Sequence, residues 1–171
     1  MALCINNWHI NHDIILLCYP FIIDEPMRSI IAFLSFFTMI SLNAAAVLHP
    51  IQGKDIPFSE LQGKWVLINY WASWCQPCLD EIPELNRFYD NNKNKMALFA
   101  VNYDMLPDKK QQQLTRYYNI HYPALKKDPA ESLHLGDIRG VPVTFVFNPQ
   151  GQLTETLYGG QTANYLNSLI K

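Results

Sequence analysis

The stretch from Trp65 to Cys78 constrains the fold more than any other part of this 171-residue chain. Trp65–Trp71 (WVLINYW) is an almost continuous apolar run rich in aromatic and β-branched residues, which is typical of a central strand covered on both faces. Two cysteines, Cys75 and Cys78, follow this run at once, and the apolar spacing of the next residues predicts a helix over 79–89. The chain therefore places two thiols at a junction between a strand and a helix.

A thiol pair in this position is suited to disulfide exchange. A helix N-terminus stabilises a thiolate through its free backbone N–H groups and its dipole, so Cys75 is the expected nucleophile. Cys78 lies about one helical turn further on, on the same side, and can resolve a mixed disulfide. A disulfide between the two closes a very short loop and adds little to the stability of the fold, so its role is expected to be chemical. Pro77 suits an early helical position, and with Gln76 it should influence the reduction potential.

Two neighbours of the pair are further candidates. Glu81 is three residues after Cys78, so a helix places its carboxylate near that sulfur, where it could take the proton that Cys78 must lose. The alternative is a solvated charge beside Asp80 and Glu84, because acidic residues are favourable near any helix N-terminus. Trp74, directly before the pair, is a candidate for the rim of the site, whereas the other aromatic residues of the stretch are expected in the core.

The remaining pattern alternates strands and helices along a single domain. It predicts an α/β fold with a mixed central sheet and helices on both faces. Pro83 is expected to kink the helix after the cysteines. The other expected elements are a short turn capped by Ser59 and ended near Gly63, a strand over 96–103, a helix over 108–118 capped by Asp108, an edge segment over 124–126, a short helix over 130–135, a hairpin of 143–147 and 153–158, and a last helix from Thr162 to 170.

The first 46 residues are expected to lie outside the folded domain. A basic residue, an apolar stretch and three consecutive alanines follow Met27, which matches a secretory signal over 27–46. An uncleaved membrane anchor is the alternative, because the apolar stretch approaches the length of about 20 residues that a span needs. Residues 1–26 carry acidic side chains and are interpreted as a non-native extension from an early start codon. The domain of residues 47–171 is therefore expected outside the cytoplasm.

Charge and ligand spacing argue against two other classes of function. The formal net charge is −2 and no cluster of Lys and Arg exceeds two neighbours, so no nucleic acid is expected as a partner. A zinc site needs four ligands, and the histidines of the expected domain, His49, His121 and His134, lack paired spacing. We expect no metal and no cofactor other than the redox-active disulfide Cys75–Cys78.

A proline before a later strand completes the set of candidate features. Val141-Pro142 directly precedes the strand expected over 143–147, where a proline is tolerated as a first residue. The pattern alone favours a trans bond, because only about 5% of X-Pro bonds in folded proteins are cis.

Four stretches carry a resemblance to a known family: Asn69–Cys78 (NYWASWCQPC), Glu81–Leu85 (EIPEL), Gly140–Phe145 (GVPVTF) and Asn148–Gly151 (NPQG). Together they resemble the extracytoplasmic thioredoxin-fold proteins of the TlpA and ResA type over essentially all of the expected domain. The resemblance implies a thioredoxin-like fold and protein-disulfide oxidoreductase activity.

The resemblance also implies roles for individual residues. Cys75 would be the exposed nucleophile, Cys78 the resolving cysteine and Glu81 an active-site acid. Pro142 would be a cis-proline facing the cysteines, and the backbone of Val141 would pair with a bound peptide. The expected substrate-binding residues are Trp74, Gln76, Pro77, Val141 and Pro142.

Two positions depart from relatives. Asn69 stands where cytoplasmic thioredoxins carry a buried aspartate, and it cannot act as a general base, so proton transfer falls more heavily on Glu81. Val143 stands where cytochrome c maturation proteins such as CcmG often have glutamate, which weakens that particular assignment.

We expect a monomeric periplasmic thiol-disulfide oxidoreductase that is soluble after signal cleavage or anchored at its N-terminus. It would reduce protein disulfides and be recharged by a membrane donor of the DsbD type. Cytochrome c maturation, repair of misoxidised proteins and supply of another thiol enzyme all fit as its purpose. The alternatives are an oxidase or isomerase of the same fold and a copper chaperone of the Sco type, although the latter uses a longer Cys-x-x-x-Cys spacing with a late histidine.

Overall fold

The computed structural model describes residues 46–170. The expected extension over 1–26 and the expected signal peptide or anchor lie outside this range, apart from residue 46. Among the described residues, no helix has both the length and the apolar character needed to cross a membrane.

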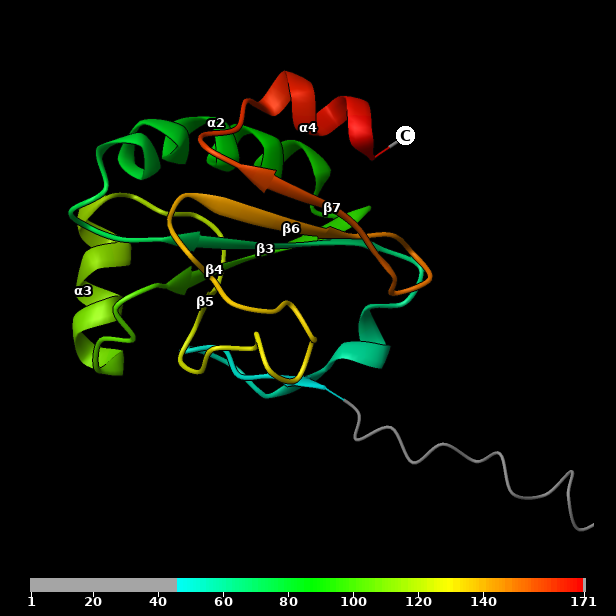
Figure 1. The fold of residues 1–171 in the computed structure, drawn as a ribbon, viewed down its shortest axis with the longest axis horizontal. Coiled ribbons are helices and arrows are strands. Elements are labelled where there is room, and N and C mark those ends of the chain that lie inside the picture. Colours follow the sequence, from blue (N-terminus) through cyan, green and yellow to red (C-terminus); the bar gives the residue numbers. More distant parts are fainter. Residues whose placement is uncertain (1–45, 171) are drawn as a thin grey trace, which may run out of the picture. The chain divides into compact units, whose positions relative to one another are not determined.

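A mixed sheet of five strands forms the centre of the domain, in the order β5-β4-β3-β6-β7 (Figure 1). The central strand β3 (Trp65–Trp71) has the bounds that its apolar run predicts. It pairs in parallel with β4 (Met96–Asn102) and antiparallel with β6 (Val143–Phe147). The edge strands β5 (Ala124–Leu125) and β7 (Leu153–Tyr158) pair with β4 and β6, so the predicted edge segment and hairpin are confirmed.

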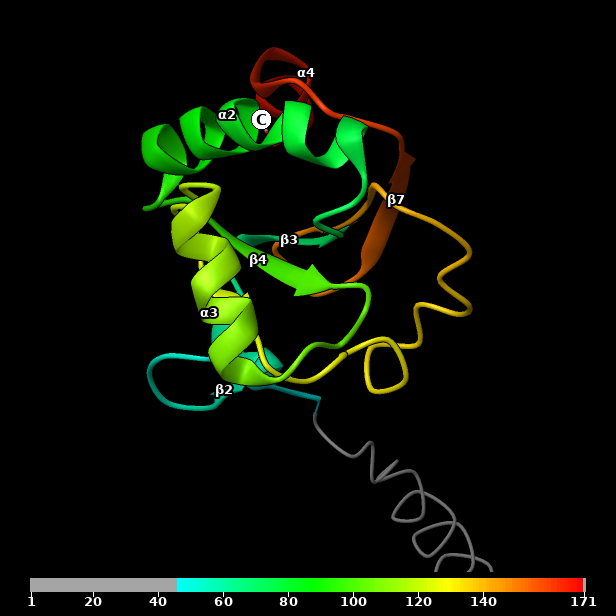
Figure 2. The same cartoon turned by 90° about the vertical axis from the view of Figure 1, so that its left-hand side faces the viewer.

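Two helices cover one face of this sheet (Figures 1 and 2). The long helix α2 (Gln76–Asn92) begins at the cysteine pair and continues past Pro83. The last helix α4 (Ala163–Leu169) packs against α2 and is capped by the Thr162 side chain, as predicted. The third helix, α3 (Asp108–Tyr117), lies beside β5.

Short elements cover the opposite face of the sheet. The strands β1 (Val47–Leu48) and β2 (Ile56–Pro57) form a small antiparallel pair, which leads into the 3-10 helix η1 (Phe58–Leu61). Side chains of η1 and of the irregular segment 126–141 pack on this face.

Alternate residues of β3 point into two separate hydrophobic cores, because successive strand side chains face opposite sides of a sheet. Leu67 and Trp71 face the core beneath α2 and α4, which also contains both cysteines of the pair. Ile68 and Tyr70 face the second core, together with the apolar side chains of β6 such as Phe145.

Three local predictions were wrong. Asp108 does not cap α3, because Pro107 occupies the N-cap and Asp108 lies in the first helical turn, where its charge complements the helix dipole. Ser59 does not cap η1 either, since it lies inside that helix. The segment 130–135 forms only a turn closed by short-range backbone bonds, and His134 ends it with a positive φ of 53°.

Candidate functional site

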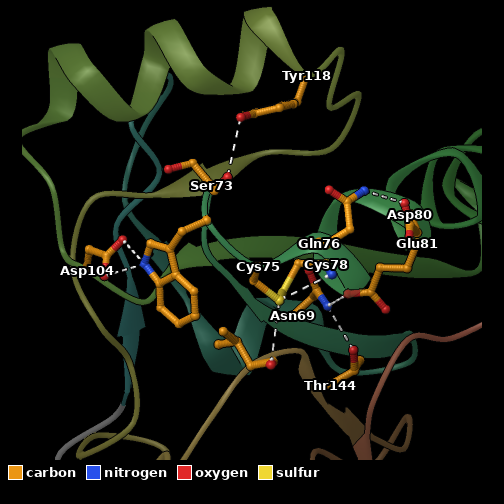
Figure 3. The surroundings of a disulfide bond; sticks show 12 residues. Asn69, Ser73, Cys75, Gln76, Cys78, Asp80, Glu81, Asp104, Tyr118 and Thr144 are labelled. Atoms are coloured by element: carbon orange, nitrogen blue, oxygen red, sulfur yellow. Dashed lines mark hydrogen bonds between the residues drawn. A yellow bond between two sulfur atoms is a disulfide. The ribbon is translucent and has the colours of Figure 1, made fainter.

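The two cysteines are joined by a disulfide at the N-terminus of α2, with an S–S distance of 2.08 Å (Figure 3). Cys75 is the N-cap residue, and the backbone N–H of Cys78 donates to its sulfur at 3.3 Å. This N–H is one of the free donors that every helix N-terminus leaves, and in the reduced protein it would stabilise a thiolate on Cys75. Cys75 is 5% exposed and Cys78 0%, so an incoming sulfur meets Cys75 first.

The loop before β6 lies against the disulfide. The carbonyl oxygen of Val141 is 3.6 Å from the sulfur of Cys75. The Val141–Pro142 peptide bond is cis, which confirms the expectation drawn from the family resemblance and not the one drawn from X-Pro frequencies. Val141 is half-buried and Pro142 is buried, so Val141 is the more accessible residue of this bond beside Cys75.

Glu81 lies one turn after Cys78 on α2 and is only 3% exposed, so it is not the solvated charge of the alternative interpretation. One carboxylate oxygen accepts from the Asn69 side-chain amide and the other from the backbone N–H of Gln161, each at 2.9 Å. Burial raises the pKa of Glu81 to about 7, although the two donors act in the opposite direction. The carboxyl group therefore changes its charge near neutral pH.

Asn69 links Glu81 to a third strand. Its side-chain nitrogen also donates to the hydroxyl of Thr144 on β6 at 3.0 Å, as Figure 3 shows. Asn69 and Thr144 are both fully buried, so α2, β3 and β6 meet in one polar cluster beneath the cysteines. Tyr122 lies close enough for the charge of Glu81, together with burial, to raise its pKa.

Trp74 forms the exposed rim that the sequence predicted, with 64% of its surface accessible. Its indole N–H donates to both carboxylate oxygens of Asp104, at 3.0 and 3.1 Å. Its ring meets the ring of Tyr103 edge-to-face at 6.3 Å between centroids. The loop after β4 therefore holds Trp74 beside the disulfide.

The remaining sequence candidates lie on the solvent side of the helix start. Gln76 is exposed and donates to the carboxylate of Asp80 at 2.8 Å. Pro77 is also exposed and lies in the first turn of α2. Proline is favoured there because the N–H that it lacks would have no partner within the helix. Every predicted site residue thus gathers around the helix N-terminus and the loop before β6.

Sequence reasoning missed Asp104, Thr144 and Gln161 as contributors to the site. Asp104 follows the end of β4, which runs parallel to β3, the strand that leads to the cysteines. Residues just after the carboxyl ends of neighbouring parallel strands lie close together, and this rule could have identified Asp104 from the sequence. Thr144 is 75 residues from Asn69 in the sequence, so no local pattern links the two side chains. Gln161 contributes only its backbone N–H, which almost every residue type has, so its side chain gives no signal. Only the folded chain identifies these two.

The histidines do not join the cysteines. His49 pairs with Asp55 and His121 with Asp90, both on the surface. Between residues 46 and 170, no three side chains of His, Cys, Asp or Glu are grouped so that they could hold a metal ion.

The sequence model of the AhpC/TSA family matches residues 41–156. The thiol-disulfide oxidoreductase ResA of Bacillus subtilis is 29% identical over 127 residues, which cover 72% of this chain and 69% of ResA. ResA of Oceanobacillus iheyensis is 30% identical over 128 residues, covering 72% of this chain and 65% of that protein. Among solved structures, StoA from Bacillus subtilis superposes with a TM-score of 0.63 and 24% identity, over 77% of this chain and 99% of StoA.

Proposed function

The chain belongs to the AhpC/TSA family and is a thiol-disulfide oxidoreductase of the thioredoxin fold, and from this premise we propose that it reduces protein disulfides outside the cytoplasm. The observation that carries the proposal is the pair itself, in which Cys75 is the more accessible sulfur, beside the Val141 carbonyl, and Cys78 is fully buried one helical turn before Glu81. The secretory signal expected over 27–46 supports the location. The named activity of the ResA relatives supports the chemistry.

The reduced protein would act in two exchange steps. The thiolate of Cys75 attacks one sulfur of the substrate disulfide, forms a mixed disulfide and releases the first substrate thiolate. Cys78 then attacks the Cys75 sulfur, closes the Cys75–Cys78 disulfide and releases the second thiolate. Two electrons pass from the protein dithiol to the substrate, which leaves the protein in the oxidised state of this structure.

Glu81 would supply the proton acceptor for the second step. The buried thiol of Cys78 must lose its proton before it attacks, and solvent does not reach it. A carboxylate with a pKa of about 7, one helical turn away, is matched to that task near neutral pH. The proton would leave with the released substrate thiol.

The surface around Cys75 would bind the substrate as an extended segment. The backbone of Val141, beside the Cys75 sulfur, would pair with the segment, and the ring of Trp74 would contact an apolar side chain next to the substrate cysteine. Asp104 would hold the indole in place for this contact.

A trapping experiment tests the mechanism. In a Cys78→Ser variant the first step proceeds and the second does not, so the mixed disulfide with Cys75 accumulates and its partner can be identified by mass spectrometry. The matched control is Cys75→Ser, which should trap nothing. Equal trapping by the two variants would contradict the assigned roles. Stoichiometric copper in the purified reduced protein would instead favour a metal chaperone.

The reduction potential tests the direction of electron flow. A reductase recharged by a membrane donor of the DsbD type should have a potential near that of thioredoxin, about −270 mV. A value near −120 mV would identify an oxidase. Trapped apocytochrome would assign the protein to cytochrome c maturation, which the Val143 position does not itself favour.

A further inference from the structure

Three buried polar atoms, in the region where β3 and β4 end and α3 begins, have no hydrogen-bond partner within residues 46–170. They are the indole nitrogen of Trp71, the side-chain nitrogen of Asn102 and the side-chain oxygen of Gln111. Each of the three residues is at most 2% exposed, so bulk solvent does not reach these atoms. A buried polar atom without a partner is costly, and three in one region call for a common explanation.

The backbone of Leu106 determines which end of each amide is left over. Its N–H donates to the side-chain oxygen of Asn102 at 3.4 Å, and its C=O accepts from the side-chain nitrogen of Gln111 at 2.6 Å. Reversing either amide would set two donors or two acceptors against each other. The leftover groups are therefore a donor on Asn102 and an acceptor on Gln111, which are complementary but form no direct hydrogen bond.

The three side chains point toward the same region. Trp71 pairs with Asn102 in the register of β3 and β4, and paired residues of neighbouring strands point to the same face of a sheet. For Trp71 this is the face that carries the core beneath α2. Gln111 lies two helical turns before Tyr118, on the same side of α3, and the Tyr118 ring packs edge-to-face on that of Trp71 at 5.8 Å between centroids.

We propose that these three groups bind one internal water molecule, which links α3 to the ends of β3 and β4. The water would accept from the indole N–H of Trp71 and from the side-chain amide of Asn102, and it would donate to the carbonyl oxygen of Gln111. This number of bonds matches the roughly three that a buried water typically makes. Two N–H donors would repel a cation and a carbonyl oxygen would repel an anion, so a neutral donor and acceptor fits the site.

The water would also stabilise the loop between β4 and α3, because Asn102 and Gln111 lie at the two ends of this loop and both hold its Leu106. The same loop supplies Asp104, whose carboxylate accepts from the indole of the exposed Trp74. A site with no exposed atom thus supports part of the surface beside the cysteines. The inference depends neither on the direction of electron flow nor on the role proposed for Glu81.

A crystal structure of the purified, oxidised protein, at a resolution that shows ordered waters, tests the site. One water should lie at hydrogen-bond distance, about 2.7–3.2 Å, from all three atoms. In solution, the indole hydrogen of Trp71 should show a direct nuclear Overhauser contact to a long-lived water. An empty site, or a water that misses any of the three atoms, would overturn the proposal.

A pair of substitutions on α3 gives the matched control. Gln111→Met removes the one acceptor among the three groups and keeps a side chain of similar length, so the contact between the Trp71 indole and water should disappear. Gln113→Met makes the same change at an exposed position of the same helix and should leave the contact unchanged. A contact that persists in Gln111→Met would overturn the proposal. The crystal structure of the wild-type protein decides the question even where this variant does not fold.

Discussion

The two faces of the central sheet are built from alternate residues of the same strands, yet their chemistry differs. The face toward α2 buries Asn69 and Thr144, which form a polar cluster with Glu81 beneath the disulfide. The opposite face buries a continuous apolar core that includes Ile68 and Phe145. We therefore expect one face to tune the reactivity of the cysteines and the other to stabilise the fold, so substitutions on the two faces should separate reactivity from stability.

The largest effect on activity should come from Cys75, on the face of the sheet that carries the polar cluster. Replacing Cys75 with Ser removes the more accessible sulfur of the pair, so disulfide exchange should fall to the uncatalysed background. Stability should change little, because the lost bridge closes a very short loop. Insulin reduction and thermal unfolding of the same preparation measure the two effects. Residual exchange comparable to wild type would remove Cys75 as the nucleophile.

The apolar face should show the reverse behaviour. Phe145→Ala empties a buried position packed edge-to-face on Tyr70, and should lower the free energy of unfolding by about 3–5 kcal/mol. The exchange rate should stay at the wild-type value at temperatures where the variant is folded. Denaturant unfolding and the insulin assay check this pair of outcomes. A large loss of activity in the folded variant would show that the two faces are not separate.

Glu81→Gln should change how stability depends on pH. Because the pKa of Glu81 is raised to about 7 in the folded protein, the native state binds more protons than the unfolded state between about pH 4.5 and 7. The free energy of unfolding therefore falls as the pH rises through this window, by about 3 kcal/mol in total. The variant should lack this fall, which urea unfolding at pH 4, 6 and 8 measures. Parallel curves for the two proteins would contradict the buried, titrating carboxyl.

The smallest effect should come from the exposed rim. Asp104→Ala releases the Trp74 indole, and the loss of one exposed, charge-assisted contact should raise KM for a protein substrate by roughly two- to fivefold with kcat unchanged. Asp80→Ala is the matched control, because it removes another exposed carboxylate that accepts from a side chain near the cysteines. Equal effects of the two variants would argue against a specific role for the Trp74 contact.

The elements that carry continuous apolar runs could be predicted from the sequence. Trp65–Trp71 and Met96–Asn102 are buried on both sides, so their hydrophobicity alone marks them as strands. The segment 130–135 has helical spacing but too few residues to continue beyond one turn. The cysteines and Glu81 could be placed together from the sequence because all three lie within the first two turns of one helix, where spacing along the chain determines which side chains are neighbours. The partners of Glu81 were not found, because Asn69 and Gln161 reach it from 12 and 80 residues away.

The rate of the resolving step as a function of pH tests the central claim most directly. A single-turnover measurement would follow the closing of the Cys75–Cys78 disulfide from a preformed mixed disulfide, in wild type and in Glu81→Gln. In the wild type the rate should rise with pH and level off near pH 7, where Glu81 becomes charged. In the variant it should be about 100-fold slower at pH 7 and continue to rise at higher pH. Superimposable profiles for the two proteins would contradict the claim that Glu81 takes the proton of Cys78.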